Sequence, residues 1–437
     1  MTESLLSRYW LERLSACRQL FVGFSGGLDS TVLLHHLTLQ AGLREKLHAI
    51  HIHHGLSIHA DAWQAHCQRW CDARSIPLTT RQVKLGNFSN IEEKARIARY
   101  QQFSSLLSEN DCLLLGHHAD DQAETMLLQL LRGAGIDGLA AMAEEDRLAK
   151  GWLARPFLAF TRQTLEDYAR AYELDWIEDE SNQNPHFARN YLRHTVMPLL
   201  RAKWPSVATT LMRSASHCQQ AKMNLETLAV MDCQCLTEQN DTLPLSFLAS
   251  LDRARVGNVL RVWLKKNQVR LPPTTILRRL IDELIFASQD ANPHVQWDDV
   301  EVRRYQRALY LLKHQKATQS RGKQRWAFFP QPLSLDGMGY LYAEPVAKGL
   351  KVPAGSAIEV GFRQGGETLF WHGQTKQLKK LMQQWRIPPW QRDSIPLIYI
   401  NGCLAAVADY AISDYFLGSD TAYQIQLRTD SIESCIF

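Results

Sequence analysis

The chain has 437 residues, 45% of them hydrophobic and 22% charged, with a formal net charge of +4 at pH 7. This length favours two or three domains, and the composition argues against long disorder or a fibrous repeat. No run reaches the roughly twenty apolar residues of a membrane span, and charges interrupt the first twenty residues, so we expect a cytoplasmic protein with no membrane partner. Nine scattered cysteines predict reduced thiols rather than a disulfide framework.

Short apolar runs and stretches of helical periodicity alternate through the first 180 residues. The runs predict strands at residues 20–24, 47–52, 78–85, 112–115 and 152–158, and the stretches between them predict helices at 61–74, 91–107, 121–131 and 162–172. This alternation predicts an α/β domain over residues 1–205. We expect a doubly wound, mainly parallel sheet with helices on both faces and ligands at the carboxyl ends of the strands.

The first predicted strand leads into a serine- and glycine-rich turn and then a helix. In this arrangement free backbone N–H groups and the positive end of a helix dipole converge on an anion. The turn lacks the lysine of a G-x-x-x-x-G-K-[ST] loop and the third glycine of a dinucleotide fingerprint. It predicts a pyrophosphate cradle in which glycines admit the phosphate and an aspartate helps to bind Mg²⁺. The cradle residues are Ser25, Gly26, Gly27, Leu28, Asp29 and Ser30.

The second predicted strand ends in His51, His53 and His54. Such a cluster can ligate a metal, but histidines at a strand end more often form packing hydrogen bonds. With His117 and His118 further along the chain, these side chains leave a metal-dependent hydrolase open as an alternative function.

Two acidic residues, Asp120 and Asp121, begin the helix after the strand at 112–115, and Glu124 follows one turn later. One aspartate can cap the helix, but three carboxylates place more negative charge there than capping needs. We therefore predict that Asp121 joins Asp29 in binding Mg²⁺ on the phosphates.

Basic residues stand on two further predicted helices of this domain. Arg96 and Arg99 lie in "IEEKARIARY", and Arg189 and Arg193 are one turn apart in "ARNYLRHTV". Arginines at this spacing match phosphate groups, although they also occur on plain surfaces.

The remainder of the chain predicts an all-α middle domain at 206–316, a linker region at 317–348 and a small α+β domain at 349–437. In the last domain "TKQLKKLMQQWRIPPWQR" predicts a basic helix flanked by tryptophans. Its candidate RNA contacts are Lys376, Lys379, Lys380 and Arg386, with a plain solvated helix as the alternative interpretation.

The motifs SGGLDS, HHGL, ExxARxxRY, GHHADDQAET, RPFL, EDxSN and RNxLR occur in this order over the first 200 residues. SGGLDS resembles the signature of the PP-loop ATP pyrophosphatases, and the full series resembles the tRNA(Ile)-lysidine synthetase family in its long bacterial form. The resemblance implies a ligase that uses ATP and Mg²⁺ to join free L-lysine to C2 of the wobble cytidine of the isoleucine tRNA with a CAU anticodon. An adenylated cytidine is the implied intermediate, and lysidine, AMP and pyrophosphate are the products.

The same resemblance implies roles for the candidate residues. The loop at 25–30 holds ATP, Asp29 and Asp121 serve the metal and phosphates, and Arg96 and Arg99 stabilise charge near the activated base. Arg189 and Arg193 contact phosphate or tRNA, and charge complementarity makes Asp120 and Glu124 candidates for the lysine ammonium. A PP-loop tRNA thiolase remains the nearest alternative enzyme. The motifs assign neither a general base nor an oligomeric state.

Overall fold

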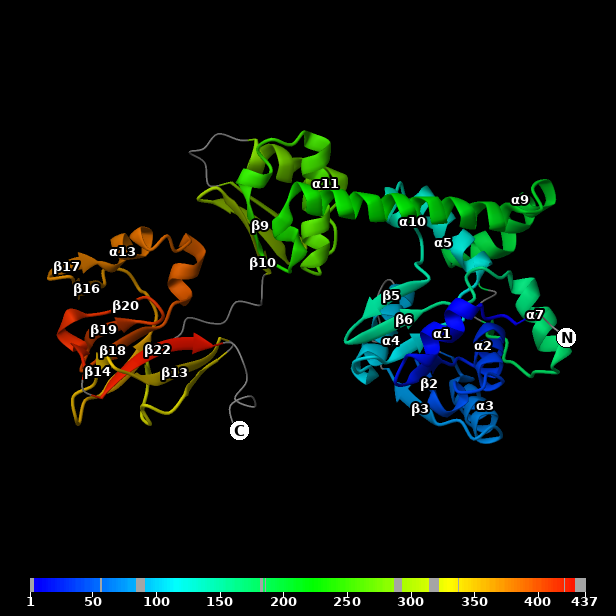
Figure 1. The fold of residues 1–437 in the computed structure, drawn as a ribbon, viewed down its shortest axis with the longest axis horizontal. Coiled ribbons are helices and arrows are strands. Elements are labelled where there is room, and N and C mark those ends of the chain that lie inside the picture. The colour runs from blue at the N-terminus through cyan, green and yellow to red at the C-terminus, as the bar shows by residue number, and fades with distance from the viewer. Residues whose placement is uncertain are drawn as a thin grey trace. The chain divides into compact units, whose positions relative to one another are not determined.

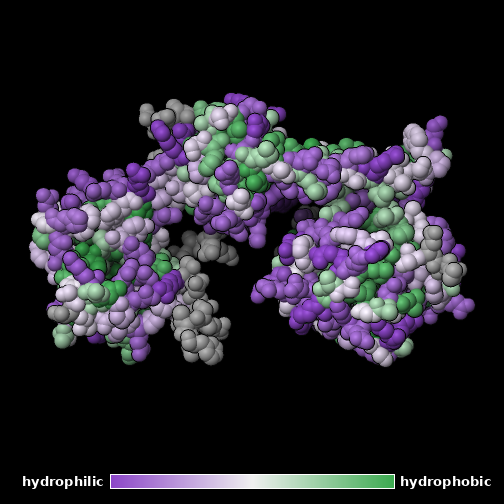
Figure 2. All heavy atoms as spheres, in the orientation of Figure 1, coloured by the Kyte–Doolittle hydropathy of each residue, from purple (hydrophilic) through white to green (hydrophobic). Residues whose placement is uncertain are grey.

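The computed structural model describes residues 4–55, 57–83, 91–180, 184, 186–286, 293–313, 322–336, 338–419 and 421–428. The chain divides into two units, Met1–Met231 and Asp232–Phe437 (Figure 1). Figure 2 shows that hydrophilic residues cover most of the visible face of both units. Among the helices of the described residues, none is both long and apolar enough to span a lipid bilayer.

A six-stranded sheet with the order β3-β2-β1-β4-β6-β5 forms the centre of the first unit. Its strands are β1 (Leu20–Gly23), β2 (Leu47–His53), β3 (Leu78–Gln82), β4 (Cys112–Leu114), β5 (Glu145–Leu148) and β6 (Gly151–Ala154). All neighbouring pairs are parallel except β5 and β6. This confirms the doubly wound, mainly parallel sheet that the sequence predicts.

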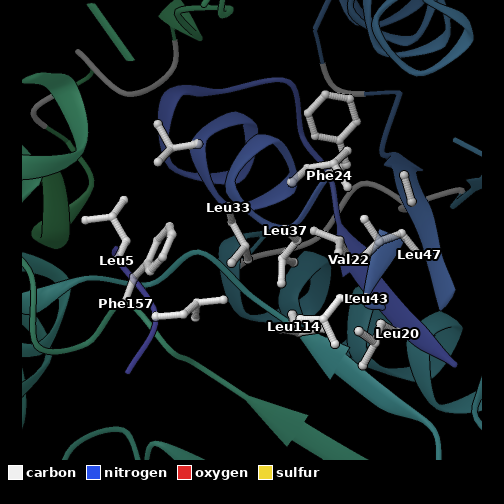
Figure 3. Packing of buried hydrophobic residues seen from close by; sticks show 14 of the residues in the cluster. Leu5, Leu20, Val22, Phe24, Leu33, Leu37, Leu43, Leu47, Leu114 and Phe157 are labelled. Carbon is white, nitrogen blue, oxygen red and sulfur yellow. The ribbon is translucent and has the colours of Figure 1, made fainter. Parts of the chain in front are cut away.

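Alternating side chains on the strands bury both faces of the sheet. Leu20 and Val22 of β1 and Leu114 of β4 join one core with residues of α1 (Arg8–Ser15), α2 (Leu28–Thr38), α3 (Ala60–Asp72) and α7 (Arg162–Ala171). Figure 3 shows Leu33 and Leu37 of α2 packing in this core beside the strands. Leu113 points to the opposite core, with Phe103 of α4 (Ile91–Leu106). Helices therefore cover both faces, because side chains of a strand alternate in direction.

The order of the strands reverses at β1, which pairs with β2 on one side and β4 on the other. In doubly wound sheets such a reversal opens a crevice for ligands at the carboxyl ends of the two strands. The segments after β1 and β4 meet there: a Cβ on Gly116 would lie 2.8 Å from the Asp29 carbonyl oxygen and 3.2 Å from the Ser30 nitrogen.

Helices complete the first unit beyond the sheet. They are α5 (Ala119–Leu131), α6 (Ile136–Leu139), α8 (Ala188–Tyr191), the π-helix η3 (Leu192–Val196), α9 (Met197–Lys203) and α10 (Val207–Asp232). Ala123 of α5, Met197 of α9 and Ala208 of α10 share a buried cluster. The segment 188–203 thus belongs to the unit that carries the sheet.

The middle region contains the expected helices and, in addition, a four-stranded antiparallel sheet. The helices are α11 (Arg253–Lys266), α12 (Thr274–Arg279), the π-helix η6 (Leu280–Ile285), and the short η4 (Gln234–Thr237) and η5 (Leu245–Phe247). The strands, in sheet order, are β7 (Thr242–Pro244), β10 (Ala308–Lys313), β9 (Val300–Tyr305) and β8 (His294–Trp297). The all-α expectation omitted this sheet because the β9–β10 turn uses Gln306 and Arg307 at positive φ instead of the usual Asn-Gly or Gly.

The described residues at the end of the chain are rich in strands and include one α-helix, α13 (Leu378–Gln384). One sheet contains β11 (Gln324–Arg325), β15 (Ile358–Gly361), β18 (Leu397–Ile400), β19 (Cys403–Val407) and β20 (Ala411–Ile412). A second contains β12 (Leu333–Leu335), β13 (Gly339–Val346), β22 (Ala422–Arg428), β14 (Gly349–Lys351) and β21 (Leu417–Gly418), and β16 (Thr368–Trp371) pairs with β17 (Gln374–Gln377). These strands and the single helix agree with the expected α+β character.

Two boundaries differ from the sequence expectations. The segment 317–348, expected as a linker, contains β11, β12 and β13, and Trp326 within it is buried in the core of the end region. Strand β11 pairs with β15 and β13 pairs with β22, both far along the chain, while β12 pairs with β13. The polar run before Trp326 does not indicate these pairings. The predicted basic helix begins only at Leu378, because 374–377 form β17 against β16. Residues 314–321 lie outside the described part.

We expect Gly116→Ala to destabilise the first unit by about 1–3 kcal/mol, because its Cβ would meet backbone atoms that cannot rotate away. The free energy of unfolding by denaturant measures this cost. Gly135→Ala is a matched control, since Gly135 has a φ of −77° and no atom within 4 Å of an added Cβ. Equal effects of the two substitutions would contradict the close approach.

Candidate active site

The loop after β1 is shaped by its own hydroxyl groups. The Ser25 and Ser30 hydroxyl oxygens are 3.1 Å apart, and the Ser30 hydroxyl donates to the Gly27 carbonyl at 3.0 Å. Gly27 caps α2, and Asp29 stands in the first turn of that helix. The first N–H groups of a helix have no partner inside it, so this turn presents donors and a positive dipole end to an anion.

Gly26 is required by both conformation and space. Its φ is +81°, and an added Cβ would lie 2.8 Å from Ile177 Cδ1 and 3.0 Å from Cys67 Sγ. Cys67 is fully buried, and burial raises the pKa of its thiol to about 12. The cysteine beside the loop is therefore a packing group rather than an exposed thiolate nucleophile.

His118 lies at the centre of the acidic residues, at the start of α5. Its ring nitrogens are 3.7 Å from Asp29 Oδ2, 3.6 Å from Asp120 Oδ2 and 3.4 Å from Asp121 Oδ2. The side chain is 1% exposed. Burial alone would lower the pKa of His118, but the three carboxylates raise it above its usual value. The structure thus brings Asp29 and Asp121 together, as predicted, around a histidine that the sequence placed only in the hydrolase alternative.

Arg189 of α8 and Arg193 of η3 both pair with acidic residues of α5. Nε of Arg189 donates to Glu124 Oε2 at 2.8 Å, and Nε of Arg193 donates to Glu124 Oε1 at 2.7 Å. Their Nη2 atoms donate to Asp121 Oδ1 at 2.8 and 3.0 Å. Burial opposes ionisation of Asp121, yet His118 and the arginines hold its pKa well below the usual range. A lysine ammonium at Glu124 would therefore have to replace a guanidinium.

Asp120 joins three elements of the first unit. Its Oδ2 accepts from the backbone N–H of Arg162 at the start of α7 at 2.8 Å, and its Oδ1 pairs with Arg201 of α9. Burial raises the pKa of Asp120, but His118, this N–H group and Arg201 together lower it to about 2. Sequence reasoning missed Arg201, because eight residues separate it from Arg193 and a regular helix would turn it to another face.

Arg99 of α4 is a partly buried cation. Its Nε atom is buried and has no hydrogen-bond partner among the described residues. Burial lowers the pKa of Arg99, and the positive charges of Arg96 and Arg189 lower it further, against an opposing effect of Tyr100. Arg96 is exposed and lies over the Tyr100 ring, with its Cζ 5.1 Å from the centroid. Arg99 is therefore suited to bind an anion, because a buried charge needs an opposite charge nearby.

The predicted histidine cluster serves packing. His51 Nδ1 is 3.0 Å from the Phe24 carbonyl oxygen, and His53 Nε2 is 3.0 Å from Asp61 Oδ1. Burial lowers the pKa of His117 to about 3, and its Nδ1 accepts from Arg155 Nε at 3.3 Å. Across the described ranges, no group of three or more His, Cys, Asp or Glu side chains is arranged to hold a metal.

Asp29 nevertheless fits the smaller demand of Mg²⁺, while both oxygens of Asp121 already accept hydrogen bonds, Oδ1 from Arg189 and Arg193 and Oδ2 from the His118 backbone N–H. This ion binds through one or two carboxylates and completes its shell with phosphate oxygens and water. Asp29 Oδ1 is buried and has no hydrogen-bond partner in the described part of the chain. Burial and the nearby Asp121 raise the pKa of Asp29, a cost that a bound cation would remove.

The predicted RNA contacts of the end region lie in the second unit. Lys376 is on β17, with Nζ 5.0 Å from the centroid of the Trp371 ring. Lys379 and Lys380 are exposed on α13, and Arg386 is exposed directly after it. Trp385 stacks with Tyr410 at 5.6 Å between centroids. Basic groups and partly exposed rings therefore share this region.

Three family models match the chain in order. A PP-loop domain matches residues 4–200, a TilS substrate binding domain 243–310, and a TilS substrate C-terminal domain 358–429. The tRNA(Ile)-lysidine synthase of Legionella pneumophila (strain Paris) is 52% identical over 95% of this chain and 96% of its own length. The protein of that name from Coxiella burnetii is 42% identical, covering 93% and 92%, and that from Serratia proteamaculans is 39% identical, covering 95% and 96%.

The ion pair of Asp120 should contribute to acid stability. Because its folded pKa is about 2, below the usual 3.8, its stabilisation is present above about pH 4 and is lost as the pH falls toward 2. We expect Asp120→Asn to remove up to about 2 kcal/mol of this pH-dependent stability. Free energies of unfolding of the first unit between pH 6 and 2 measure it. An unchanged acid slope would contradict the pairing.

Proposed function

The chain belongs to the tRNA(Ile)-lysidine synthase family, and we propose that it joins free L-lysine to C2 of the wobble cytidine of the CAU-anticodon isoleucine tRNA. ATP activates the cytidine, and the products are lysidine, AMP and pyrophosphate. The observation that carries this proposal is the meeting of the loop at 25–30, Asp29 and Asp121 at the reversal between β1 and β4. A phosphate cradle and carboxylates at one edge suit transfer of an adenylyl group.

ATP binds with its phosphates against the turn that begins α2. Gly26 gives the turn its left-handed conformation, with a φ of +81°, and the Ser25 and Ser30 hydroxyls are 3.1 Å apart beside it. Asp29 and Asp121 would hold Mg²⁺, which would supply positive charge to the departing pyrophosphate. The Nε atom of Arg99 is buried without a hydrogen-bond partner in the described residues, and this guanidinium stabilises the anionic phosphate or the activated base.

The reaction then proceeds in two displacements. O2 of the cytosine attacks the α-phosphorus of ATP, and the bond to the β-phosphate oxygen breaks to release pyrophosphate. A base then takes a proton from the side-chain ammonium of lysine. The resulting neutral amine attacks C2, and the C2–O bond breaks to release AMP. The cytidine must leave the stack of the anticodon loop for either atom to be reached, since a stacked base is sterically covered.

Asp120 and Glu124 remain the proposed receptors of the lysine ammonium. At Glu124 this requires exchange with Arg189 or Arg193, which now occupy both carboxylate oxygens. Exchange of one cation for another keeps the buried carboxylate compensated and avoids the large cost of an unpaired charge.

The basic surface of the end region supports binding of the tRNA body. Lys376, Lys379, Lys380 and Arg386 supply cations for phosphates, and the nearby Trp385–Tyr410 stack offers ring surface for unpaired bases. The thiolase and hydrolase alternatives are not favoured, because the curated relatives that match over the full length are lysidine synthases.

Incorporation of labelled lysine into tRNA tests the function. With ATP and Mg²⁺, label should enter the CAU isoleucine tRNA and be absent when that tRNA is omitted. Asp121→Asn should lower the rate of pyrophosphate release on the order of 100-fold while tRNA still binds. Asp167→Asn, an exposed carboxylate of α7, is the control. ATP cleavage without lysine transfer would refute the lysidine assignment.

Phosphate contacts by the end region predict a change in salt dependence. Replacing Lys376, Lys379 and Lys380 together by alanine should weaken tRNA binding and reduce the slope of log affinity against log salt by about 0.9 per lost contact. Lys348→Ala, an exposed lysine of the same region, is the control. If the triple variant and the control bind with equal slopes, the basic helix is only a solvated surface.

A further inference from the structure

Residues 188–203 form one uninterrupted helical segment with a π-turn in its middle. It consists of α8, η3 and α9 in direct succession. The π-turn is explicit in its hydrogen bonding: the Met197 N–H donates to the Leu192 carbonyl, five residues back. The segment carries Arg189, Arg193 and Arg201, and each of the three pairs with a carboxylate of α5.

A regular α-helix could not direct all three arginines toward α5. At 3.6 residues per turn, the eight residues from Arg193 to Arg201 overshoot two turns by about 80°. A π-turn absorbs one residue, so the same interval acts as seven residues and falls within about 20° of two turns. The π-turn therefore accounts for the position of Arg201 on the face that meets Asp120.

Pro198 gives the local reason for the π-turn. Proline has no N–H, and in a regular helix its ring collides with the carbonyl four residues earlier, here that of His194. The widened turn at 192–196 ends two residues before Pro198 and relieves this collision. The proline thus disfavours the regular helix in which Arg201 would face away from α5.

Arg201 acts on the site through Asp120, which also holds the start of α7 through the Arg162 N–H and lies 3.6 Å from the His118 ring. The same ring lies against Asp29 and Asp121. We propose that Arg201 and Pro198 are positioning residues of the active site: the proline keeps Arg201 in phase, and Arg201 fixes Asp120 and with it the first turn of α5. This role rests on the proposed function, because its purpose is to align Asp121 for ATP.

Steady-state pyrophosphate release by the full chain tests the role in catalysis. Arg201→Ala and Pro198→Ala should each lower kcat by about 10- to 100-fold, the usual effect of losing an outer-shell partner, with the KM for tRNA unchanged. Arg201→Lys should recover part of the loss, since it restores the charge without the guanidinium geometry. Lys203→Ala, exposed two residues further on α9, is the control. Pro198→Ala should fold, because alanine favours helix.

The double variant Pro198→Ala/Arg201→Ala shows whether the two residues act on kcat together or independently. If Pro198 acts only by directing Arg201, the kcat of the double variant equals that of Arg201→Ala alone. Multiplied losses would overturn the link between the two residues. A kcat of Arg201→Ala equal to that of Lys203→Ala would overturn the role altogether.

A measurement on stability addresses the same geometry without any assay of function. In the wild-type background, the shifts in Tm caused by Arg201→Ala and Asp120→Asn should be non-additive, because each removes the same pair. In a Pro198→Ala background they should become additive. A coupling that survives Pro198→Ala contradicts the inference, whereas failure of wild-type pyrophosphate release with intact coupling contradicts only the proposed function.

Discussion

The site depends on guanidinium groups that compensate the carboxylates at the start of α5. A helix N-terminus favours one or two negative charges, but Asp120, Asp121 and Glu124 are all nearly buried there. Arg189, Arg193 and Arg201 pair with these carboxylates from one neighbouring segment. Without them, three buried anions would repel each other and any triphosphate, so this pairing stabilises the fold and favours anion binding at this edge.

Two buried polar atoms without hydrogen-bond partners support the proposed positions of the ligands. Glu124 has both oxygens bonded to arginines, whereas Asp29 Oδ1 and Arg99 Nε are buried without hydrogen-bond partners in the described residues. One of these unpartnered groups is anionic and the other cationic. They match the two halves of a metal–nucleotide complex, because the carboxylate suits the cation and the guanidinium suits the phosphate.

Local sequence predicted the parts of this site that depend on neighbours in the chain. A strand, a glycine turn and a helix start form the loop at 25–30, and Asp121 follows a buried strand, so both were placed at the same sheet edge. Arg201 was missed because the direction of its side chain depends on the π-turn at 192–196. A period of 3.6 residues assumes a regular α-helix and does not predict such a turn. Strands β11 and β13 were missed because their partners β15 and β22 lie far away in the sequence, and β12 pairs with β13. Their order comes from these nonlocal pairs.

The arginine pairing also constrains how lysine can enter. If Glu124 receives the ammonium as proposed, one guanidinium must leave it, and a displaced guanidinium in a mostly buried site needs a new anion. The phosphate of the adenylated cytidine is such an anion, and it exists only after the first displacement. Lysine binding and retention of the activated base then favour each other. The lysine ammonium takes the place of a guanidinium at Glu124, and the displaced guanidinium pairs with the phosphate of the adenylated cytidine. An arginine side chain at these positions suits this exchange better than a lysine side chain would, because its five N–H donors can bond a carboxylate and a phosphate with the same geometry.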